Sequence, residues 1–229
     1  MKSRGEDNFI NLPTFAARLY SSLSHTKAIE RQHKEIARDL VSRIEVGRTL
    51  DVGTGPGRLL FESHRLNSRL ELYGLDISEA MVELAKENLT GIEVNICRGT
   101  IRQTDYADDF FDIVTCTGSF YLWNHPAECL AEIYRILKRG RSAYLFETYN
   151  DYDKVEVQET LKANLSRESL LRRLITPVFL RRQLRMTYQI SEIAAIIERT
   201  AFAGSYSLEK ITLGGLPAWL RIELTKIAS

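Results

Sequence analysis

Three glycines and a carboxylate accompany a short apolar run near residue 50. The stretch TLDVGTGPGR covers residues 49–58, with Asp51 in the run and Thr54 inside the turn that follows. The glycines alternate along this turn, at Gly53, Gly55 and Gly57. Glycine adopts positive φ and has no Cβ, so the backbone here can approach a flat or bulky ligand closely. A tight turn without a ligand would use the same residues, and both interpretations stay open on the glycines alone.

A second carboxylate follows the turn after about twenty residues, the spacing at which a ribose-binding acid is found. Asp76 ends the run LYGLD, where its two oxygens can accept both hydroxyls of a ribose. Charge-assisted hydrogen bonds of this kind contribute ~1.5–3 kcal/mol each. The dinucleotide fingerprint needs a third glycine where this chain has Arg58. The pattern therefore indicates a nucleoside ligand and disfavours a nicotinamide cofactor.

The elements that must position these residues alternate along the chain. Apolar, β-rich runs predict strands at 49–52, 70–75, 92–96, 110–116 and 141–147, and helical periodicity predicts helices at 57–66, 78–89 and 126–137. Such alternation is typical of parallel strands joined by crossover helices. We therefore expect an α/β fold with a doubly wound sheet and helices on both faces. Ligands bind at the carboxyl ends of such strands, where the glycine turn would lie.

Two serines and one glycine predict helix boundaries. Ser78 and Ser191 are expected at N-caps, because serine oxygens accept the free backbone N–H groups of a first helical turn. Gly140 follows Lys138 and Arg139, and a glycine after basic residues is typical of a helix C-terminus.

Three further segments flank this core, and we expect all of residues 1–229 to form a single domain. A helical N-terminal cap is predicted over 12–44, where Ile29, Ile36, Leu40 and Ile44 recur near the helical period. A helical insert rich in Arg and Leu is predicted over 151–190, above the site. The runs YSLEKITL and AWLRIELTKI flank Gly214, Gly215 and Pro217, which predicts a terminal β-hairpin.

Four motifs in this order resemble those of the class I S-adenosylmethionine-dependent methyltransferases. They are LDVGTGPG, LDIS, DDFFDIVTC and NHPAECLAEIYRILKRGRSAYL. The chain is most similar to the small-molecule branch that includes the ubiquinone and menaquinone biosynthesis enzymes, over residues 12 to 148. The resemblance implies a Rossmann-like seven-stranded sheet, mostly parallel with an antiparallel terminal hairpin. It also implies S-adenosylmethionine as the cofactor.

The resemblance further implies a role for each matching residue. Asp51 and the turn from Gly53 to Gly57, including Thr54 and Gly55, would face the amino-acid part of the cofactor, and Asp76 would bind its ribose. The remaining expected cofactor contacts are Ile77 and Met81 against adenine, Thr117 near the methionine part, and Tyr20 closing over the cofactor. Ile77 and Met81 could equally be ordinary core residues, being one helical turn apart.

Two positions depart from the family pattern. The family's Gly-Asp before a variable loop is replaced by Gly99, Thr100 and Ile101. Thr100 can still accept one hydrogen bond, without charge, so we expect Thr100 and Ile101 on the adenine side and a weaker recognition of adenine. The family's Leu-Lys-Pro-Gly-Gly turn is replaced by LKRGR, which contains Arg139 and Arg141. This turn is remote from the site, so we expect the replacement to have only a structural effect.

Methyl transfer from a sulfonium is an in-line displacement, so alignment of the reactants is the main task of the enzyme and can contribute ~7–11 kcal/mol. A general base is needed when the acceptor is a hydroxyl, an acidic carbon or a protonated amine. His125 and Glu147 are candidates, although a residue at a helix start or strand end often has a structural role. His125 and Cys129 lie four residues apart, but two ligands do not make a metal site, and no metal is expected.

Composition limits the partners and the compartment. Lys and Arg total 31 and Asp and Glu 30, for a net charge of +1, which does not indicate a nucleic acid. Cys97, Cys116 and Cys129 form no CxxC pair, which favours reduced thiols and a cytoplasmic protein. The N-terminus MKSRGEDNFINLP carries charges where a signal peptide would be apolar, and no apolar run reaches the ~18 residues of a membrane helix.

The Arg-rich insert leaves three interpretations open: a lid with a solvated basic face, a grip for a phosphorylated or carboxylated substrate, or a membrane or RNA surface. The leading functional hypothesis is a methyltransferase acting on a small-molecule acceptor. The alternatives are a non-catalytic subunit that binds S-adenosylmethionine and, with less support, an RNA methyltransferase. The missing Pro-Pro-Tyr and Pro-Cys elements disfavour methylation of base amines and of cytosine carbon. The oligomeric state stays open.

Overall fold

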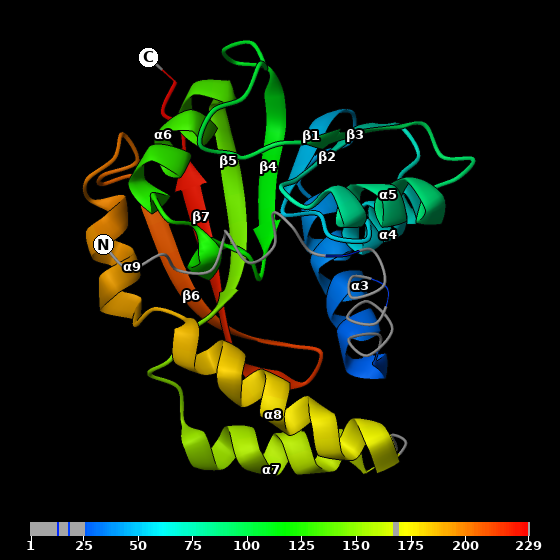
Figure 1. Ribbon diagram of the computed structural model, residues 1–229. Coiled ribbons are helices and arrows are strands. Elements are labelled where there is room, and N and C mark those ends of the chain that lie inside the picture. The colour runs from blue at the N-terminus through cyan, green and yellow to red at the C-terminus, as the bar shows by residue number, and fades with distance from the viewer. Residues whose placement is uncertain (1–12, 14–17, 19–25, 167–169, 229) are drawn as a thin grey trace.

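A seven-stranded sheet forms the centre of the molecule (Figure 1). The computed structural model describes residues 13, 18, 26–166 and 170–228. The strands lie in the order β3-β2-β1-β4-β5-β7-β6. Their bounds are Gly47–Val52 (β1), Leu70–Asp76 (β2), Val94–Arg98 (β3), Phe111–Thr117 (β4), Leu137–Thr148 (β5), Tyr206–Leu213 (β6) and Leu216–Thr225 (β7). The strand order reverses between β1 and β4, and this is the switch point at which open α/β sheets bind ligands.

Strand directions confirm the predicted fold class. β1 to β5 are parallel, with Leu50 opposite Val114 in the β1–β4 pair. β7 is antiparallel to both of its neighbours, with Leu145 opposite Ile222 in the β5–β7 pair. The expected terminal hairpin is therefore present, and the fold is a mostly parallel, Rossmann-like sheet.

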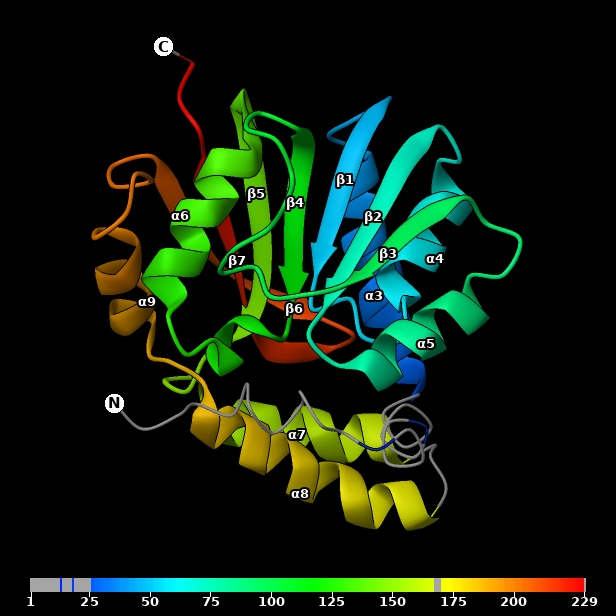
Figure 2. The same ribbon diagram turned by 45° about the horizontal axis from the view of Figure 1, so that its top comes forward.

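Helices cover both faces of this sheet (Figures 1 and 2). α3 (Lys27–Val41), α4 (Arg58–Leu66) and α5 (Glu79–Asn88) share one apolar cluster with the sheet, and α6 (Pro126–Ile136) and α9 (Ile190–Ile197) share another. Alternate residues of a strand point to opposite faces. Along β4, Ile113 accordingly belongs to the first cluster and Val114 to the second.

The insert predicted over 151–190 contains two helices, α7 (Lys154–Leu165) and α8 (Leu170–Met186), before α9 begins. Asp153 is the N-cap of α7, and its Oδ1 accepts hydrogen bonds from the N–H groups of Val155 and Glu156. Figure 2 shows α7 and α8 as a layer below the ends toward which β1 and β4 point. Leu184 of α8 and Val157 of α7 are buried against Ala218 of β7, which holds the layer at the carboxyl edge.

The hairpin turn between β6 and β7 fixes the position of α3. The Gly214 N–H donates a 2.8 Å hydrogen bond to Glu35 Oε2 of α3. A Cβ at Gly214 would overlap the carbonyl oxygen of Ala28, and its φ of +58° favours glycine. The last strands of the chain thereby hold the first described helix against the sheet.

Two helix boundaries predicted from sequence are wrong. α6 ends at Ile136, and Gly140 lies inside β5, where its N–H donates to the Lys226 carbonyl. The strand begins early because Leu137 pairs with buried Phe111 of β4. α9 begins at Ile190 rather than after Ser191, because Gln189 and Glu192 form a reciprocal capping box.

Other local predictions have mixed outcomes. Ser78 occupies the N-cap of α5 as expected, but its side chain makes no capping hydrogen bond, and its N–H donates to Asp76 instead. Of the helical cap predicted over 12–44, the structure describes chiefly α3. Tyr20 lies outside the described residues. No helix in the described ranges is long and apolar enough to cross a bilayer.

Candidate functional site

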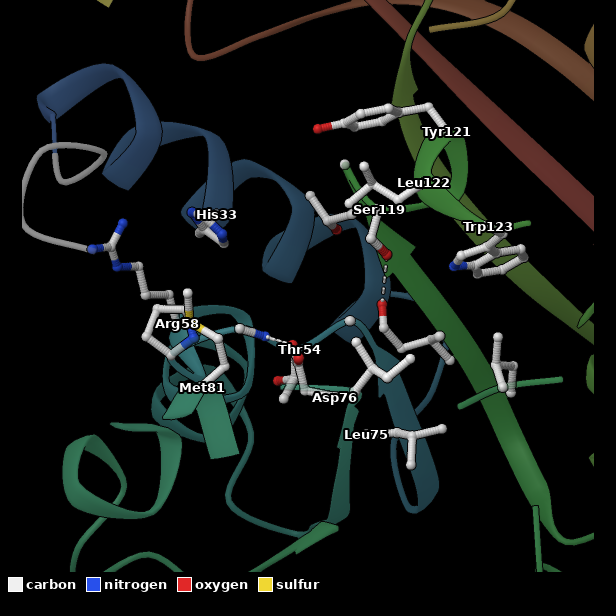
Figure 3. A pocket seen from close by; sticks show the side chains of 18 of the residues that line it. His33, Thr54, Arg58, Leu75, Asp76, Met81, Ser119, Tyr121, Leu122 and Trp123 are labelled. Atoms are coloured by element: carbon white, nitrogen blue, oxygen red, sulfur yellow. Dashed lines mark hydrogen bonds between the residues drawn. The ribbon is translucent and has the colours of Figure 1, made fainter. Parts of the chain in front are cut away.

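A cavity lies at the carboxyl ends of β1, β2 and β4 (Figure 3). Its described lining comes from the glycine turn, the ends of the three strands, and segments distant in sequence. These distant contributors are Ile29, Gln32 and His33 of α3, Tyr121, Leu122 and Trp123 around the 3-10 helix η1 (Phe120–Leu122), Gln183 of α8 and Trp219 of β7. The cavity thus coincides with the place where the sheet topology predicts a ligand.

The glycine turn packs against the segment that follows β4. The Gly53 N–H donates a 2.7 Å hydrogen bond to the Leu75 carbonyl, and its φ is +70°. A Cβ at Gly53 would overlap Ser119 Oγ and lie 2.8 Å from Ser119 Cβ. Ser119 Oγ in turn donates to the Val52 carbonyl at 3.3 Å. Only glycine fits at position 53 without displacing the Ser119 loop.

Asp76 is oriented by the backbone around it. Its Oδ2 accepts a 2.8 Å hydrogen bond from the Gly55 N–H, and its Oδ1 accepts a 2.9 Å bond from the Ser78 N–H. Each carboxylate oxygen can accept a further hydrogen bond, and Asp76 lines the cavity. Burial raises the pKa of Asp76, while the nearby backbone amides of Ser78, Gly55 and Ile77 act against this rise. The backbone therefore fixes the orientation of this carboxylate at the wall of the cavity.

Asp51 and Gly57 lie behind the cavity rather than in its lining. Asp51 is 3% exposed, and burial raises its pKa to about 7; the nearby Thr54 hydroxyl acts against this rise and the Asp76 charge adds to it. A Cβ at Gly57 would come within 2.8 Å of Leu89 Cδ1, so this glycine allows α4 to pack on α5. Gly53, Thr54 and Gly55 are the turn residues that line the cavity.

The residues expected on the adenine side lie together. Ile77, Met81, Thr100 and Ile101 all line the cavity. Met81 and Ile101 are each only 3% exposed, so they also pack in the interior. Thr117 lines the cavity at the end of β4, and its Oγ1 is buried with no hydrogen-bond partner among the described residues. What these side chains contact in a complex stays a prediction.

The two candidate bases lie elsewhere. His125, at the N-cap of α6, does not line the cavity, and its Nδ1 is 3.3 Å from Glu128 Oε1. Glu147 is fully buried outside the lining, where its oxygens accept hydrogen bonds from the Tyr121 and Thr148 N–H groups. Burial raises the pKa of Glu147 to about 8. Its visible role is to attach η1 to the end of β5.

His33 of α3 is a cavity residue that motif analysis missed (Figure 3). Its Nδ1 lies 2.8 Å from the Ile29 carbonyl oxygen. A carbonyl can only accept, so Nδ1 carries the proton, and in the neutral ring Nε2 is the acceptor nitrogen. No sequence motif marks His33, because its position depends on how α3 docks on the hairpin.

Charge is sparse among the described residues that line the cavity. Among its described lining residues, the side chains with a formal charge at neutral pH are Arg58 and Asp76. The side nearest η1 presents Tyr121, Leu122 and Trp123, with Gln183 and Trp219 adjoining Gly118. Aromatic and amide side chains of this kind suit a planar or apolar ligand with neutral polar groups.

Residues 50–145 match the family model described as a methyltransferase domain. The uncharacterized methyltransferase YdaC of Bacillus subtilis is 32% identical over 94 residues, covering 41% of this chain and 52% of the relative. The ubiquinone/menaquinone biosynthesis C-methyltransferase UbiE of Geotalea daltonii is 30% identical over 124 residues, covering 52% and 53%. This chain therefore spans about half the length of the curated relatives that it matches.

Solved structures match nearly the whole chain. A structure from Methanococcus maripaludis, reported as that of a putative S-adenosylmethionine-dependent methyltransferase, has a TM-score of 0.64 at 22% identity, and the match covers 96% of this chain and 95% of that chain. The plantazolicin methyltransferase BpumL, solved with a desmethylplantazolicin analogue and S-adenosylhomocysteine (SAH), has a TM-score of 0.71 at 16% identity, covering 98% and 95%. At these identities the two structures establish the shared fold.

Proposed function

We propose that this protein, whose motifs resemble those of the class I S-adenosylmethionine-dependent methyltransferases and whose residues 50–145 match a methyltransferase domain, methylates a small organic acceptor. S-adenosylmethionine is the methyl donor, bound at the carboxyl ends of β1 and β2. The cytoplasm is the proposed compartment, supported by three free cysteines.

The observation that carries the proposal is the pairing of Asp76 with the glycine turn. Asp76 has acceptor capacity left after its two backbone hydrogen bonds, which suits the two hydroxyls of a ribose. A Cβ at Gly55 would meet no described atom within 4 Å, so the turn leaves room beside this carboxylate. The orphaned Thr117 Oγ1 suits a polar group of the methionine part. These residues fit an adenosyl amino acid.

The acceptor is proposed to lie between η1, α8 and α3, beyond the end of β4. The supporting feature is the neutral, aromatic lining there, with Tyr121, Trp123 and Trp219. A cationic amine would need a carboxylate partner, and Asp76, the one described carboxylate in the lining, is assigned to the ribose. A neutral, planar hydroxyl or carbon acid fits better than an ammonium substrate.

The bound cofactor supplies an electrophilic methyl group on its sulfonium. The residues of this chain hold the donor and acceptor in line, through Asp76, the glycine turn and the aromatic side chains of η1. Trp219 and Leu122 exclude water from the reacting atoms. His33 Nε2 accepts the proton of an acceptor hydroxyl, a role for which neither His125 nor Glu147 is placed.

Calorimetric titration with SAH tests the cofactor site. We expect binding by the intact protein, and a loss of about 10–100-fold in affinity in Asp76→Asn, because one ribose hydroxyl loses its charged acceptor. Exposed Glu93→Gln is the matched control and should bind as the original does. A well-folded protein that gives no heat with this ligand would contradict the proposed function.

Transfer of label from methyl-labelled S-adenosylmethionine into a metabolite extract tests catalysis. Labelled product supports an enzyme, whereas tight binding of SAH without any transfer supports the non-catalytic alternative.

A further inference from the structure

α8 carries a strong local positive charge. The helix contains five arginines and no acidic residue, whereas the chain as a whole has a net charge of +1. Arg173, Arg181 and Arg185 are exposed, and no described carboxylate pairs with any of the three. Surface arginines elsewhere, such as Arg48 and Arg69, form ion pairs with glutamates. Among the described residues, these three arginines of α8 therefore have no ion-pair partner.

Apolar side chains accompany this charge on the outward face of α8. Leu174 is 73% exposed and Val178 is 66% exposed. At 3.6 residues per turn, Leu174, Val178 and Arg181 fall on one face, and Gln183 falls on the opposite one. Gln183 lines the cavity, so the Leu174 stripe points away from it. A helix that only covered the site would need no aliphatic side chains on its outer face.

We propose that the outward face of α8, formed by Leu174, Val178, Arg181 and Arg185, docks on a membrane surface rich in anionic lipid. Aliphatic side chains would enter the boundary between headgroups and acyl chains, while the arginines would bind lipid phosphates. Two other partners fit less well. A second copy would set α8 against its own like charges in a twofold interface, and an RNA would leave Leu174 and Val178 exposed.

Docking through α8 would bring the cavity close to the bilayer, because α8 forms part of the layer at the carboxyl edge (Figure 2). An acceptor dissolved in the membrane could then enter without crossing water. This consequence rests on the proposed function, whereas the docking itself does not.

Flotation with lipid vesicles tests the docking. Vesicles of phosphatidylcholine alone are compared with vesicles of equal parts phosphatidylcholine and phosphatidylglycerol, at low and high salt. We expect binding to the anionic vesicles that weakens as salt screens the charges. Arg181→Ser combined with Arg185→Ser should weaken binding about 30-fold, from the typical contribution of one basic residue near a charged surface. Leu174→Ser combined with Val178→Ser should weaken it as well.

Arg38→Ser combined with Arg199→Ser is the matched control, because it removes the same charge from exposed sites outside α8. This variant should bind vesicles almost as the original does. The proposal is overturned if the protein stays with the unbound fraction for both vesicle types, if the control and α8 variants lose binding equally, or if the apolar variant abolishes a dimer rather than vesicle binding. Binding to RNA without binding to vesicles would also overturn it. Titration with SAH is a separate measurement, so a failure to bind vesicles would not contradict the proposed cofactor site.

Discussion

At the residue scale, the candidate site depends on groups held by backbone contacts rather than by long side chains. Asp76 is fixed by two N–H groups, and Gly53 is fixed by the hydrogen bond from its N–H to the Leu75 carbonyl. Such a site is largely formed before a ligand arrives, which lowers the entropic cost of binding. Substitutions at these positions should therefore affect affinity and stability together.

Gly53→Ala should reduce both SAH affinity and stability. The new Cβ would overlap Ser119 at a φ of +70°, so we expect a loss of roughly 2–4 kcal/mol in the free energy of unfolding. Gly91→Ala is the control, because its φ is +85° but its Cβ would meet nothing within 4 Å, and only about 1 kcal/mol should be lost. Urea denaturation measures the free energy of unfolding of both variants, and calorimetry measures their affinity for SAH. Equal losses in the two variants would show that the Ser119 contact is unimportant.

His33→Gln should slow methyl transfer by about 10²–10⁴-fold while SAH binds almost unchanged, because a general base acts on the acceptor rather than on the cofactor. His125→Gln should leave both quantities near those of the original, since His125 does not line the cavity. Transfer of label into metabolite extract and calorimetry measure the two effects. A larger effect in His125→Gln would reverse this assignment.

At the element scale, the site is assembled by the docking of distant segments. α3 contributes Ile29, Gln32 and His33, and its position is set by the β6–β7 hairpin near the other end of the chain. η1 is held by Glu147 at the end of β5, and α8 is held by Leu184 against Ala218. A perturbation of any of these contacts should reach the cavity through the element that it holds.

Gly214→Ala tests this dependence for α3. The added methyl group would displace Ala28, so we expect about 2–4 kcal/mol less stability and weaker SAH binding. Gly204→Ala, at a φ of +71° with no neighbour within 4 Å, should lose about 1 kcal/mol and bind normally. Denaturation and calorimetry on both variants make the comparison. Unchanged binding in a destabilised Gly214→Ala would separate α3 from the site.

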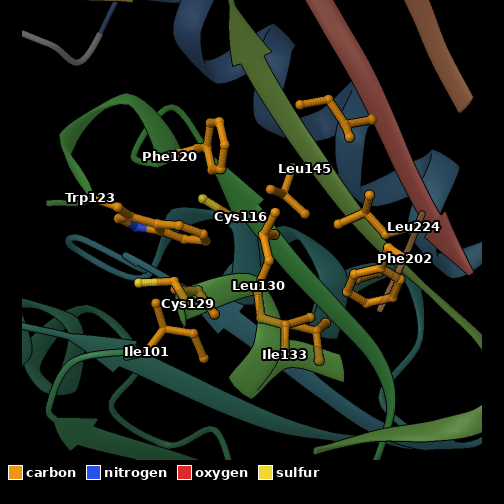
Figure 4. Packing of buried hydrophobic residues seen from close by; sticks show 14 of the residues in the cluster. Ile101, Cys116, Phe120, Trp123, Cys129, Leu130, Ile133, Leu145, Phe202 and Leu224 are labelled. Carbon is orange, nitrogen blue, oxygen red and sulfur yellow. The ribbon is translucent and has the colours of Figure 1, made fainter. Parts of the chain in front are cut away.

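At the scale of the whole molecule, two apolar clusters on either side of one sheet stabilise the fold. Figure 4 shows one of them. Cys116, Leu130 and Phe202 pack in the cluster shown there, which joins β4, α6 and the segment after α9. The buried carboxyl groups of the molecule include those of Asp51 and Glu147. Their protonation should couple the stability of the whole domain to pH.

The free energy of unfolding should fall as pH rises from about 4.5 to 8. Burial raises the pKa of Glu147 to about 8 and that of Asp51 to about 7, so the folded state binds protons that the unfolded state releases in this range. The contribution is complete below the unfolded pKa values and is lost as pH passes through the folded ones. Urea denaturation at several pH values measures the slope.

Glu147→Gln should flatten this slope, since the amide does not titrate. The substitution is expected to lower stability at acidic pH, because its NH₂ group would meet a backbone N–H that now donates to Glu147. Exposed Glu156→Gln is a control that should keep the original slope. A slope equal to that of the original protein would assign the titration to another group.

The sequence by itself determined the sheet, the order of its elements and most of the residues proposed to bind the cofactor. Those predictions depended on local signals, namely the periodicity of strands and helices and the short motifs around Gly53 and Asp76. The family resemblance also implied one site for Ile77, Met81 and Thr117, and all three line the cavity. The predicted helix boundaries at Gly140 and Ser191 were wrong. Pairing of Leu137 in the sheet overrides the first, and the capping box of Gln189 overrides the second.

Only the tertiary structure decided which residues line the part of the cavity proposed for the acceptor. Four elements that are distant in sequence contribute His33, Tyr121, Gln183 and Trp219 to the lining. The periodicity of a sequence does not indicate which distant elements will be in contact. The structure also separated Asp51, Gly57 and Glu147, which lie behind the cavity, from the turn residues that line it. The physical reason is that a side chain's type and spacing fix its chemistry, whereas its access to a ligand depends on packing between elements.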